Sequence, residues 1–265
     1  MGEVVIVFQK ALVVANANSA NDIAAQLAPV AQGPVFQSIR RTAFPGFPSL
    51  PDERIKMVAP VAEYVPKGDR FDAHLTDGTI LEGLETAQIA TGYRPFPGFV
   101  HVLNQDGIQV PLITEETTPN RVPSLHRLII YAFNPTLAFI GSMMAYTPFI
   151  IGDVTSTWLA LAWNGEIPYP DTPEGRLVFE RERLASVEKA RSEMDNPSAL
   201  MVYNVLGAFE QDYASGLRAE IVKARPEMDA ILPVWSDERT QARDAMFKTK
   251  FRALEYARDH AESSK

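Results

Sequence analysis

The stretch that decides the fold of this chain is Lys10-Ala-Leu-Val-Val-Ala-Asn-Ala-Asn-Ser-Ala-Asn-Asp-Ile-Ala-Ala-Gln-Leu27. Its first part, Ala11 to Val14, is a short apolar run that predicts a β-strand. In its second part, apolar side chains recur at the spacing of one helix face, at Ala20, Ile23, Ala24 and Leu27. Small residues join the two parts. The stretch therefore predicts a strand, a tight turn and a helix, and with them an α/β fold.

The predicted helix carries start and stop signals of its own. Asn18 or Ser19 is expected to cap the first turn, because a short side-chain oxygen accepts a hydrogen bond from a free backbone amide. Asp22 then lies where the helix dipole favours an anion. Pro29 is expected to end the helix.

The composition excludes several classes of function. The chain has 265 residues, of which 46% are hydrophobic, enough for one large or two small domains with a core. It has no cysteine, so disulfides and thiol catalysis are excluded and a cytoplasmic location is expected. The four histidines show no ligand spacing, so no metal site is expected. The net charge of −8 argues against a nucleic-acid partner, whose phosphates need a basic face.

Two apolar stretches could be mistaken for membrane or targeting segments. Leu137 to Ile151 is interrupted by Gly141 and Pro148 and falls short of the roughly 20 residues that a membrane helix needs. The start of the chain is acidic, and its apolar part is too short for a signal peptide. Because Val4 to Phe8 is strand-like with no polar residues leading into it, we expect the chain to begin within a domain.

The turn in the opening stretch has the shape of a dinucleotide-binding turn but not its glycines. The usual G-x-G-x-x-G/A pattern is represented by Ala15-Asn16-Ala17-Asn18-Ser19-Ala20, in which only the last small residue matches. The second glycine normally lets backbone approach the pyrophosphate, so the methyl group of Ala17 takes up that space. We expect weakened or lost cofactor binding at this turn. An ordinary strand–helix unit explains the stretch equally well.

The second predicted strand, Val35 to Arg41, indicates which dinucleotide would bind. The end of this strand discriminates between NAD and NADP: an acid there bonds the free 2′-hydroxyl of NAD, whereas a cation pairs with the 2′-phosphate of NADP. Here Ser38, Arg40 and Arg41 stand at that end, and no acid follows until Asp52. NADP is therefore the expected cofactor. The alternative is a solvated basic pair.

Further strands follow a Pro-rich loop over residues 43–60. A strand is expected within Ile55 to Val65, and Phe71 to Ile80 predicts a hairpin around an Asp-Gly turn. The run Leu84 to Tyr93 predicts a strand that ends in small residues. In an α/β sheet, ligands bind at the carboxyl ends of strands, and Thr91 and Gly92 would let a cofactor come close there.

At Ala90-Thr91-Gly92-Tyr93 the sequence resembles flavin-containing monooxygenases and their Baeyer–Villiger relatives, which carry an A-T-G-Y motif. Their second fingerprint, G-x-G-x-S-G-x-D, retains its serine and aspartate here as Ser19 and Asp22, while alanine replaces all three glycines. The closing segment of the family is matched by Leu125-His-Arg-Leu-Ile-Ile-Tyr, Asn134-Pro-Thr-Leu-Ala-Phe-Ile-Gly141, Pro148-Phe-Ile-Ile-Gly-Asp153 and Trp163-Asn-Gly165. The resemblance covers roughly residues 10–170.

The resemblance implies a flavoprotein in which NADPH reduces FAD and one oxygen atom is transferred to a small organic substrate, with specialised metabolites as the expected class. It implies a Rossmann-like NADP-binding domain at residues 1–95, the C-terminal half of an FAD-binding domain at 96–170, and a helical region at 171–265. Gly141 and Asp153 are expected near the flavin. Nothing before Lys10 supplies the glycine-rich turn that holds FAD in the family, and a half-built flavin domain favours self-association or a completing partner chain.

The remainder of the chain predicts amphipathic helices and no catalytic motif. Helices are expected over Arg176 to Asp195, Ala199 to Phe209 and Gln241 to Ala261. No nucleophile or carboxylate pair identifies a catalytic residue, which fits a reaction carried out by a flavin. Two hypotheses therefore stand: a monooxygenase-like enzyme whose FAD site is completed elsewhere, or a truncated, catalytically silent binding or accessory module that keeps the fold.

Overall fold

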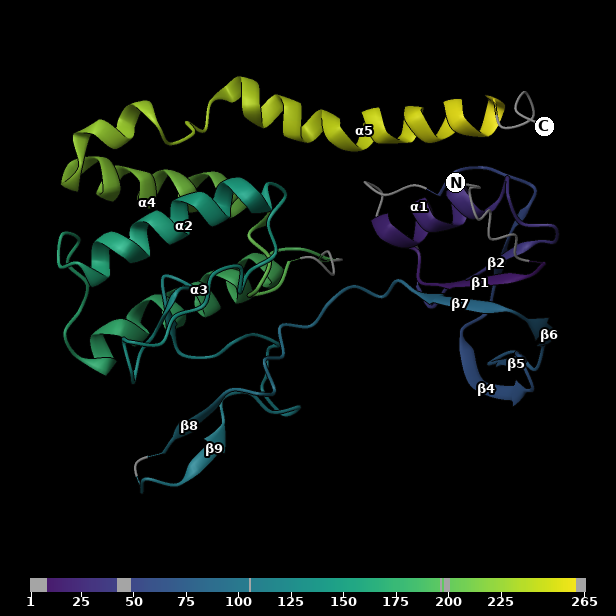
Figure 1. Ribbon diagram of the computed structural model, residues 1–265, viewed down its shortest axis with the longest axis horizontal. Helices are drawn as coiled ribbons and strands as arrows, with labels where there is room; N and C mark the ends of the chain where they lie inside the picture. The colour runs from purple at the N-terminus through teal and green to yellow at the C-terminus, as the bar shows by residue number, and fades with distance from the viewer. Residues whose placement is uncertain (1–8, 42–48, 105, 196, 198–200, 261–265) are drawn as a thin grey trace, which may run out of the picture. The chain divides into compact units, whose positions relative to one another are not determined.

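The computed structural model describes residues 9–41, 49–104, 106–195, 197 and 201–260 (Figure 1). The predicted strand-like start, Val4 to Phe8, lies outside the described residues, as does most of the first half of the Pro-rich loop. Contacts divide the chain into two compact units. Unit 1 comprises the described residues up to Tyr93 together with those from Asp244 onward, and unit 2 is Arg94–Arg243.

Unit 1 is built on a parallel sheet, and the predicted strand, turn and helix are confirmed. The strands of this sheet, in the spatial order β3-β2-β1-β7, are β3 (Ile55–Val58), β2 (Val35–Ser38), β1 (Ala11–Val14) and β7 (Thr86–Ile89). Helix α1 (Asn18–Leu27) follows β1. Because all four strands run in the same direction, their carboxyl ends meet at one edge of the sheet.

The parallel sheet of unit 1 is covered on both faces. On one face the alanines of α1, including Ala20 and Ala24, pack on Val13 and Val35. On the other face, Leu12 packs against a second, antiparallel sheet of β4 (Val61–Lys67), β5 (Arg70–Leu75) and β6 (Ile80–Leu84). The predicted hairpin is confirmed, since β5 and β6 are joined through a turn at Gly78, whose amide donates to the Leu75 carbonyl.

The predicted cap of α1 is wrong. The N-cap is Ala17, with φ −88° and ψ −175°, and its side chain makes no capping hydrogen bond. Asn18 and Ser19 lie in the first helical turn instead. The side-chain oxygen of Asn18 accepts a hydrogen bond from Lys250, which comes from the last helix of the chain. The N-terminus of α1 is therefore left without a side-chain cap.

Unit 2 is mainly helical. Its strands form two antiparallel pairs, β8 (His101–Leu103) with β9 (Gln109–Pro111), and β10 (Leu125–His126) with β11 (Ile130–Tyr131). Its helices are α2 (Pro148–Trp163), α3 (Pro173–Ser192), the 3-10 turns η1 (Gly207–Phe209) and η2 (Pro226–Ala230), and α4 (Glu210–Ala224). Its largest core joins Trp158 of α2 to Tyr213 and Leu217 of α4.

The predicted helix over Ala199 to Phe209 is wrong for the described residues, which are irregular from Met201 to Leu206. Their backbone groups bond to other segments instead of along a helix. The buried Arg183 donates to the carbonyls of Tyr203 and Val205, and the amide of Met144 donates to the Asn204 carbonyl. The sequence pattern does not reveal these long-range partners.

Contacts give two compact units, and the predicted division into three domains stays a prediction. The first boundary, after Tyr93, is close to the predicted end at residue 95, and within unit 2 one core joins residues between Leu128 and Ile167 to the helices after them. The last helix, α5 (Asp237–His260), confirms the predicted C-terminal helix, and the boundary at Arg243 falls within it. No helix in the described part of the chain is both long and apolar enough to cross a membrane.

Candidate functional site

The carboxyl edge of the parallel sheet brings three predicted site segments together. The amide of Ala15 donates to the Ser38 carbonyl at 3.0 Å, which ties the turn after β1 to the end of β2. On the other side, the amide of Ala90 donates to the Val14 carbonyl at 3.1 Å, so the chain that follows β7 leaves the sheet beside the same turn. The turn, the end of β2 and Thr91-Gly92 thus share one edge.

Ala15 has a backbone conformation that normally belongs to glycine. Its φ is +118°, in the region where the Cβ of an L-residue is crowded by the backbone. The general dinucleotide-binding pattern has its first glycine at this position. The turn therefore has the geometry of the glycine turn although its residue is alanine, and strain of about 1 kcal/mol is expected from the methyl group.

Two buried amide side chains hold the strained turn. Gln37 of β2 is fully buried, and its Nε2 donates to the Ala15 carbonyl at 3.0 Å and to Asn21 Oδ1 at 2.8 Å. Asn21 of α1, which is 5% exposed, donates in turn to the Asn16 carbonyl at 3.3 Å. Ser49 also donates to Asn21 Oδ1, at 3.2 Å. These contacts connect the strand, the turn and the helix.

The sequence motifs do not point to Gln37 or Asn21 as residues of the site. The signal was present, because Gln37 is a polar residue inside an otherwise core-type strand. Its Oε1 is buried and has no hydrogen-bond partner among the described residues. An unsatisfied buried acceptor costs about 1–3 kcal/mol, and the two hydrogen bonds that Gln37 Nε2 donates offset this cost in part.

The basic pair after β2 is exposed, whereas Ser38 is not available to a ligand. Arg40 and Arg41 are both exposed, and Asn16 Nδ2 donates to the Arg41 carbonyl, which joins this loop to the turn. Ser38 is 3% exposed, and its hydroxyl donates to the Ala59 carbonyl at 3.1 Å. Its hydroxyl thus joins β2 to the chain after β3.

The other predicted residues at this edge face outward. Ala17, Ser19, Thr91 and Gly92 are exposed. Gly92 has a φ of +86°, and a Cβ built there would meet nothing within 4 Å, so the glycine serves the turn conformation and not a close contact in this structure. The exposed Ala17 leaves the N-terminus of α1 accessible.

The C-terminal part of α5 contributes charges to unit 1. Lys250 forms an ion pair with Asp22 of α1 and donates to Asn18, so a cation lies at the first turns of that helix. Further along, Arg258 donates to the Pro51 carbonyl at 2.7 Å. A cation at the positive end of a helix dipole is unfavourable by itself, and the carboxylate of Asp22 offsets it.

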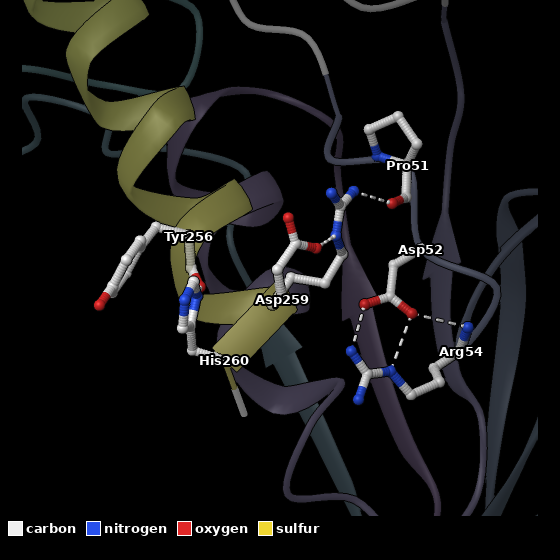
Figure 2. A network of polar contacts seen from close by, with 7 residues as sticks. Pro51, Asp52, Arg54, Tyr256, Asp259 and His260 are labelled. Carbon is white, nitrogen blue, oxygen red and sulfur yellow. Dashed lines mark hydrogen bonds and ion pairs between the residues drawn. The ribbon is translucent and has the colours of Figure 1, made fainter. Parts of the chain in front are cut away.

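Figure 2 shows the segment from Pro51 to Arg54, which contacts the end of α5. Arg54 donates to both carboxylate oxygens of Asp52, at 2.9 and 2.7 Å, and these hydrogen bonds hold the pKa of Asp52 below its ordinary value. On α5, the rings of Tyr256 and His260 stack at 3.9 Å, and Asp259 accepts from Arg258. The hydrogen bond from Arg258 to the Pro51 carbonyl joins these two groups of contacts and attaches the last turns of α5 to the loop before β3.

Gly141 and Asp153, the residues predicted near a flavin, belong to unit 2. Gly141 is exposed, has a φ of +76° and precedes α2. Asp153 is exposed on α2, where its carbonyl accepts from Thr157. Within the described residues, no group of three or more His, Cys, Asp or Glu side chains is placed to hold a metal ion.

Unit 2 also has a strained segment, around β10 and β11. Ser124, Arg127 and Leu128 all have φ between 54° and 60°. The buried carboxylate of Glu180 accepts from the amide of Ser124 at 3.0 Å. His126 lies between Ser124 and Arg127 in the sequence. Burial lowers its pKa to about 4, and the charge of Arg127 is the second-largest cause. This segment lies in the core.

Two solved structures share the fold of this chain. One is Tmm from Pelagibacter sp. strain HTCC7211, with a TM-score of 0.55 and 18% identity over 84% of this chain and 47% of that one. The other is S-allyl-L-cysteine S-oxygenase from Allium sativum, with a TM-score of 0.53 and 19% identity over 92% of this chain and 55% of that one. The chain thus spans about half the length of each. No protein-family model matches it.

Proposed function

We propose that this chain belongs to an FAD- and NADPH-dependent monooxygenase-like oxidoreductase that inserts one oxygen atom into a small organic substrate. The observation that carries the proposal is the sheet edge of unit 1, where a glycine-type turn, an uncapped helix and an exposed arginine pair come together. The shared fold with an S-oxygenase supports the reaction type. A specialised metabolite is the proposed substrate class.

NADP fits the residues of this edge. The pyrophosphate would lie at the N-terminus of α1, where free backbone amides and the helix dipole favour an anion. Arg40 and Arg41 would pair with the 2′-phosphate, since guanidinium groups bind phosphate through two parallel hydrogen bonds. Thr91 and Gly92 would border the cofactor. The exposed methyl group of Ala17 opposes close approach and is expected to weaken binding.

FAD fits the described residues only in part. When bound, it would supply the redox chemistry, while the protein supplies position and a dry site. Gly141 and Asp153 are the proposed contacts in unit 2. The described strands of that unit pair antiparallel, and none of them leads through a glycine-rich turn into a helix. The pyrophosphate of FAD would therefore need a turn from another segment or a partner chain.

The competing proposal is a catalytically silent binding or accessory module in the cytoplasm. It rests on the same observations, because a protein can keep a fold without keeping the function associated with it. The two proposals differ in what the purified protein does with FAD and NADPH. Flavin absorbance that persists after FAD is supplied and the excess removed, with oxidation of NADPH in air, supports the enzyme. A colourless protein that oxidises no NADPH contradicts it for the isolated chain.

The NADP assignment is tested separately by exchanging both arginines. The Arg40→Ser/Arg41→Ser variant should lose about 10- to 100-fold in NADPH affinity and little in NADH affinity, since charge-assisted hydrogen bonds to phosphate contribute about 1.5–3 kcal/mol. Titration calorimetry or fluorescence measures both cofactors. Arg181→Ser, an exposed arginine of α3, is the control. Equal affinity of variant and parent for NADPH would rule out the pair as the 2′-phosphate site.

A further inference from the structure

Gln37 stands out among the buried polar residues because it contacts the one strained residue of the proposed cofactor turn. Its side chain is fully buried in β2, and its Nε2 donates to the Ala15 carbonyl at 3.0 Å. The amide of the same alanine donates to the Ser38 carbonyl. Both backbone groups of Ala15 are thus bound to β2, at a φ of +118° that alanine resists.

We propose that Gln37 is a positioning residue that keeps the cofactor turn in its glycine-type conformation in the absence of the glycine. This inference rests on the proposed NADP site. A glycine adopts a φ of +118° without steric cost and needs no outside support. An alanine leaves this conformation unless the surrounding structure holds it there. At Ala15 the holding group is the side-chain amide of Gln37.

The second hydrogen bond of Gln37 extends the same effect to the helix. Its Nε2 also donates to Asn21 Oδ1 at 2.8 Å, and Asn21 donates to the Asn16 carbonyl at 3.3 Å. One buried amide therefore fixes the turn relative to the first turns of α1, whose free amides would receive the pyrophosphate. Loss of the amide should disturb cofactor binding without removing any group that touches the cofactor.

A double-mutant cycle tests this role, because the inference requires that Gln37 act through Ala15. With alanine at position 15, Gln37→Leu should weaken NADPH binding about 10-fold, or 1.4 kcal/mol. In the Ala15→Gly background, the same change should weaken binding no more than about 3-fold. Equal fold-losses in the two backgrounds would overturn the inference. If Gln37→Leu fails to fold, Gln37→Met removes the amide while keeping a flexible chain of similar length.

The control and a second readout separate this inference from the proposed function. Gln88→Leu removes another strand glutamine of the same sheet, whose amide donates to Thr86, and its effect should be the same in both backgrounds. Unfolding equilibria of the four variants in the cycle give a coupling that needs no cofactor. If no variant binds NADPH, the proposed function fails. Coupling between positions 15 and 37 then still supports the positioning role, and additive effects reject it.

Discussion

Both units contain residues other than glycine that have a positive φ, but the surroundings of these residues differ. In unit 1, Ala15 has a φ of +118° at an exposed sheet edge, next to a helix whose N-terminus has no side-chain cap. In unit 2, Ser124, Arg127 and Leu128 have φ near 60°, and Leu128 is 2% exposed. Positive φ therefore occurs both at the proposed cofactor turn of unit 1 and in the buried segment of unit 2. What distinguishes the turn of unit 1 is strain next to a helix N-terminus that has no side-chain cap.

The two units also hold their strained segments with different groups. Unit 1 uses the neutral amides of Gln37 and Asn21. Unit 2 uses ionised side chains: Glu180 accepts from the Ser124 amide and from Arg121 at 2.7 Å. Removing a buried charge leaves its partner charged and buried, whereas removing an amide leaves only dipoles unpaired. The same kind of substitution should therefore cost more in unit 2.

The largest expected effect is that of Glu180→Ala. It leaves Arg121 without its buried carboxylate and the Ser124 amide without an acceptor, so the free energy of unfolding should fall by about 3–5 kcal/mol. Urea denaturation measures the change. Glu188→Ala on the exposed face of the same helix is the control and should stay within about 0.5 kcal/mol. A similar loss in the two variants would contradict the role of the buried carboxylate.

A second prediction concerns the pH dependence of unit 2. His126 is neutral when folded, with a pKa lowered by burial from 6.5 to about 4. In the unfolded chain it binds a proton below pH 6.5, so stability is full above that pH and declines as the pH falls toward 4. The loss should reach about 3 kcal/mol.

The variant His126→Phe keeps an aromatic ring against Trp158 but cannot bind a proton. Unfolding free energies of both proteins, measured from pH 7 to 4, give a difference curve in which carboxylates common to both cancel. Stability of the variant should decline less over this range. Parallel curves would show that His126 does not carry the pH dependence.

A third prediction concerns the strained turn of unit 1. Ala15→Gly should raise the free energy of unfolding by about 1 kcal/mol, because glycine has no steric cost at a φ of +118°. Ala59→Gly is a matched control. It also directly follows a strand of the same sheet but has no positive φ, so glycine there should destabilise through the greater entropy of the unfolded chain. Destabilisation by both changes would argue against strain at Ala15.

The smallest expected effect is that of Lys250→Met, which removes the ion pair with Asp22. Both side chains are partly exposed, so the loss should be about 0.5 kcal/mol at low salt. It should vanish near 1 M salt, where the screening length is about 3 Å. Lys248→Met, an exposed neighbour on α5, is the control. A loss that persists at high salt would mean that Lys250 contributes through packing or through its hydrogen bond to Asn18.

The sequence was most informative about local structure in unit 1. Alternation and turn residues predicted the hairpin at Gly78, and apolar spacing predicted β1, α1 and β2, because these elements depend on neighbours only a few residues away. The same reasoning failed at Met201 to Leu206, whose backbone bonds to Arg183 and Met144. It also failed at the cap of α1, where Asn18 bonds to a lysine more than 200 residues away.

The sequence by itself determined the α/β class and the strand–turn–helix unit, since periodicity and residue type are local properties, while its dinucleotide-binding residues stay a prediction. Only the tertiary structure decided that Ala15 adopts the glycine conformation, that Ser38 is buried, and that Gln37 supports the turn. Those facts depend on which strands lie side by side. Hydrogen bonds between distant segments, and the strain that they maintain, arise only when the sheet has formed.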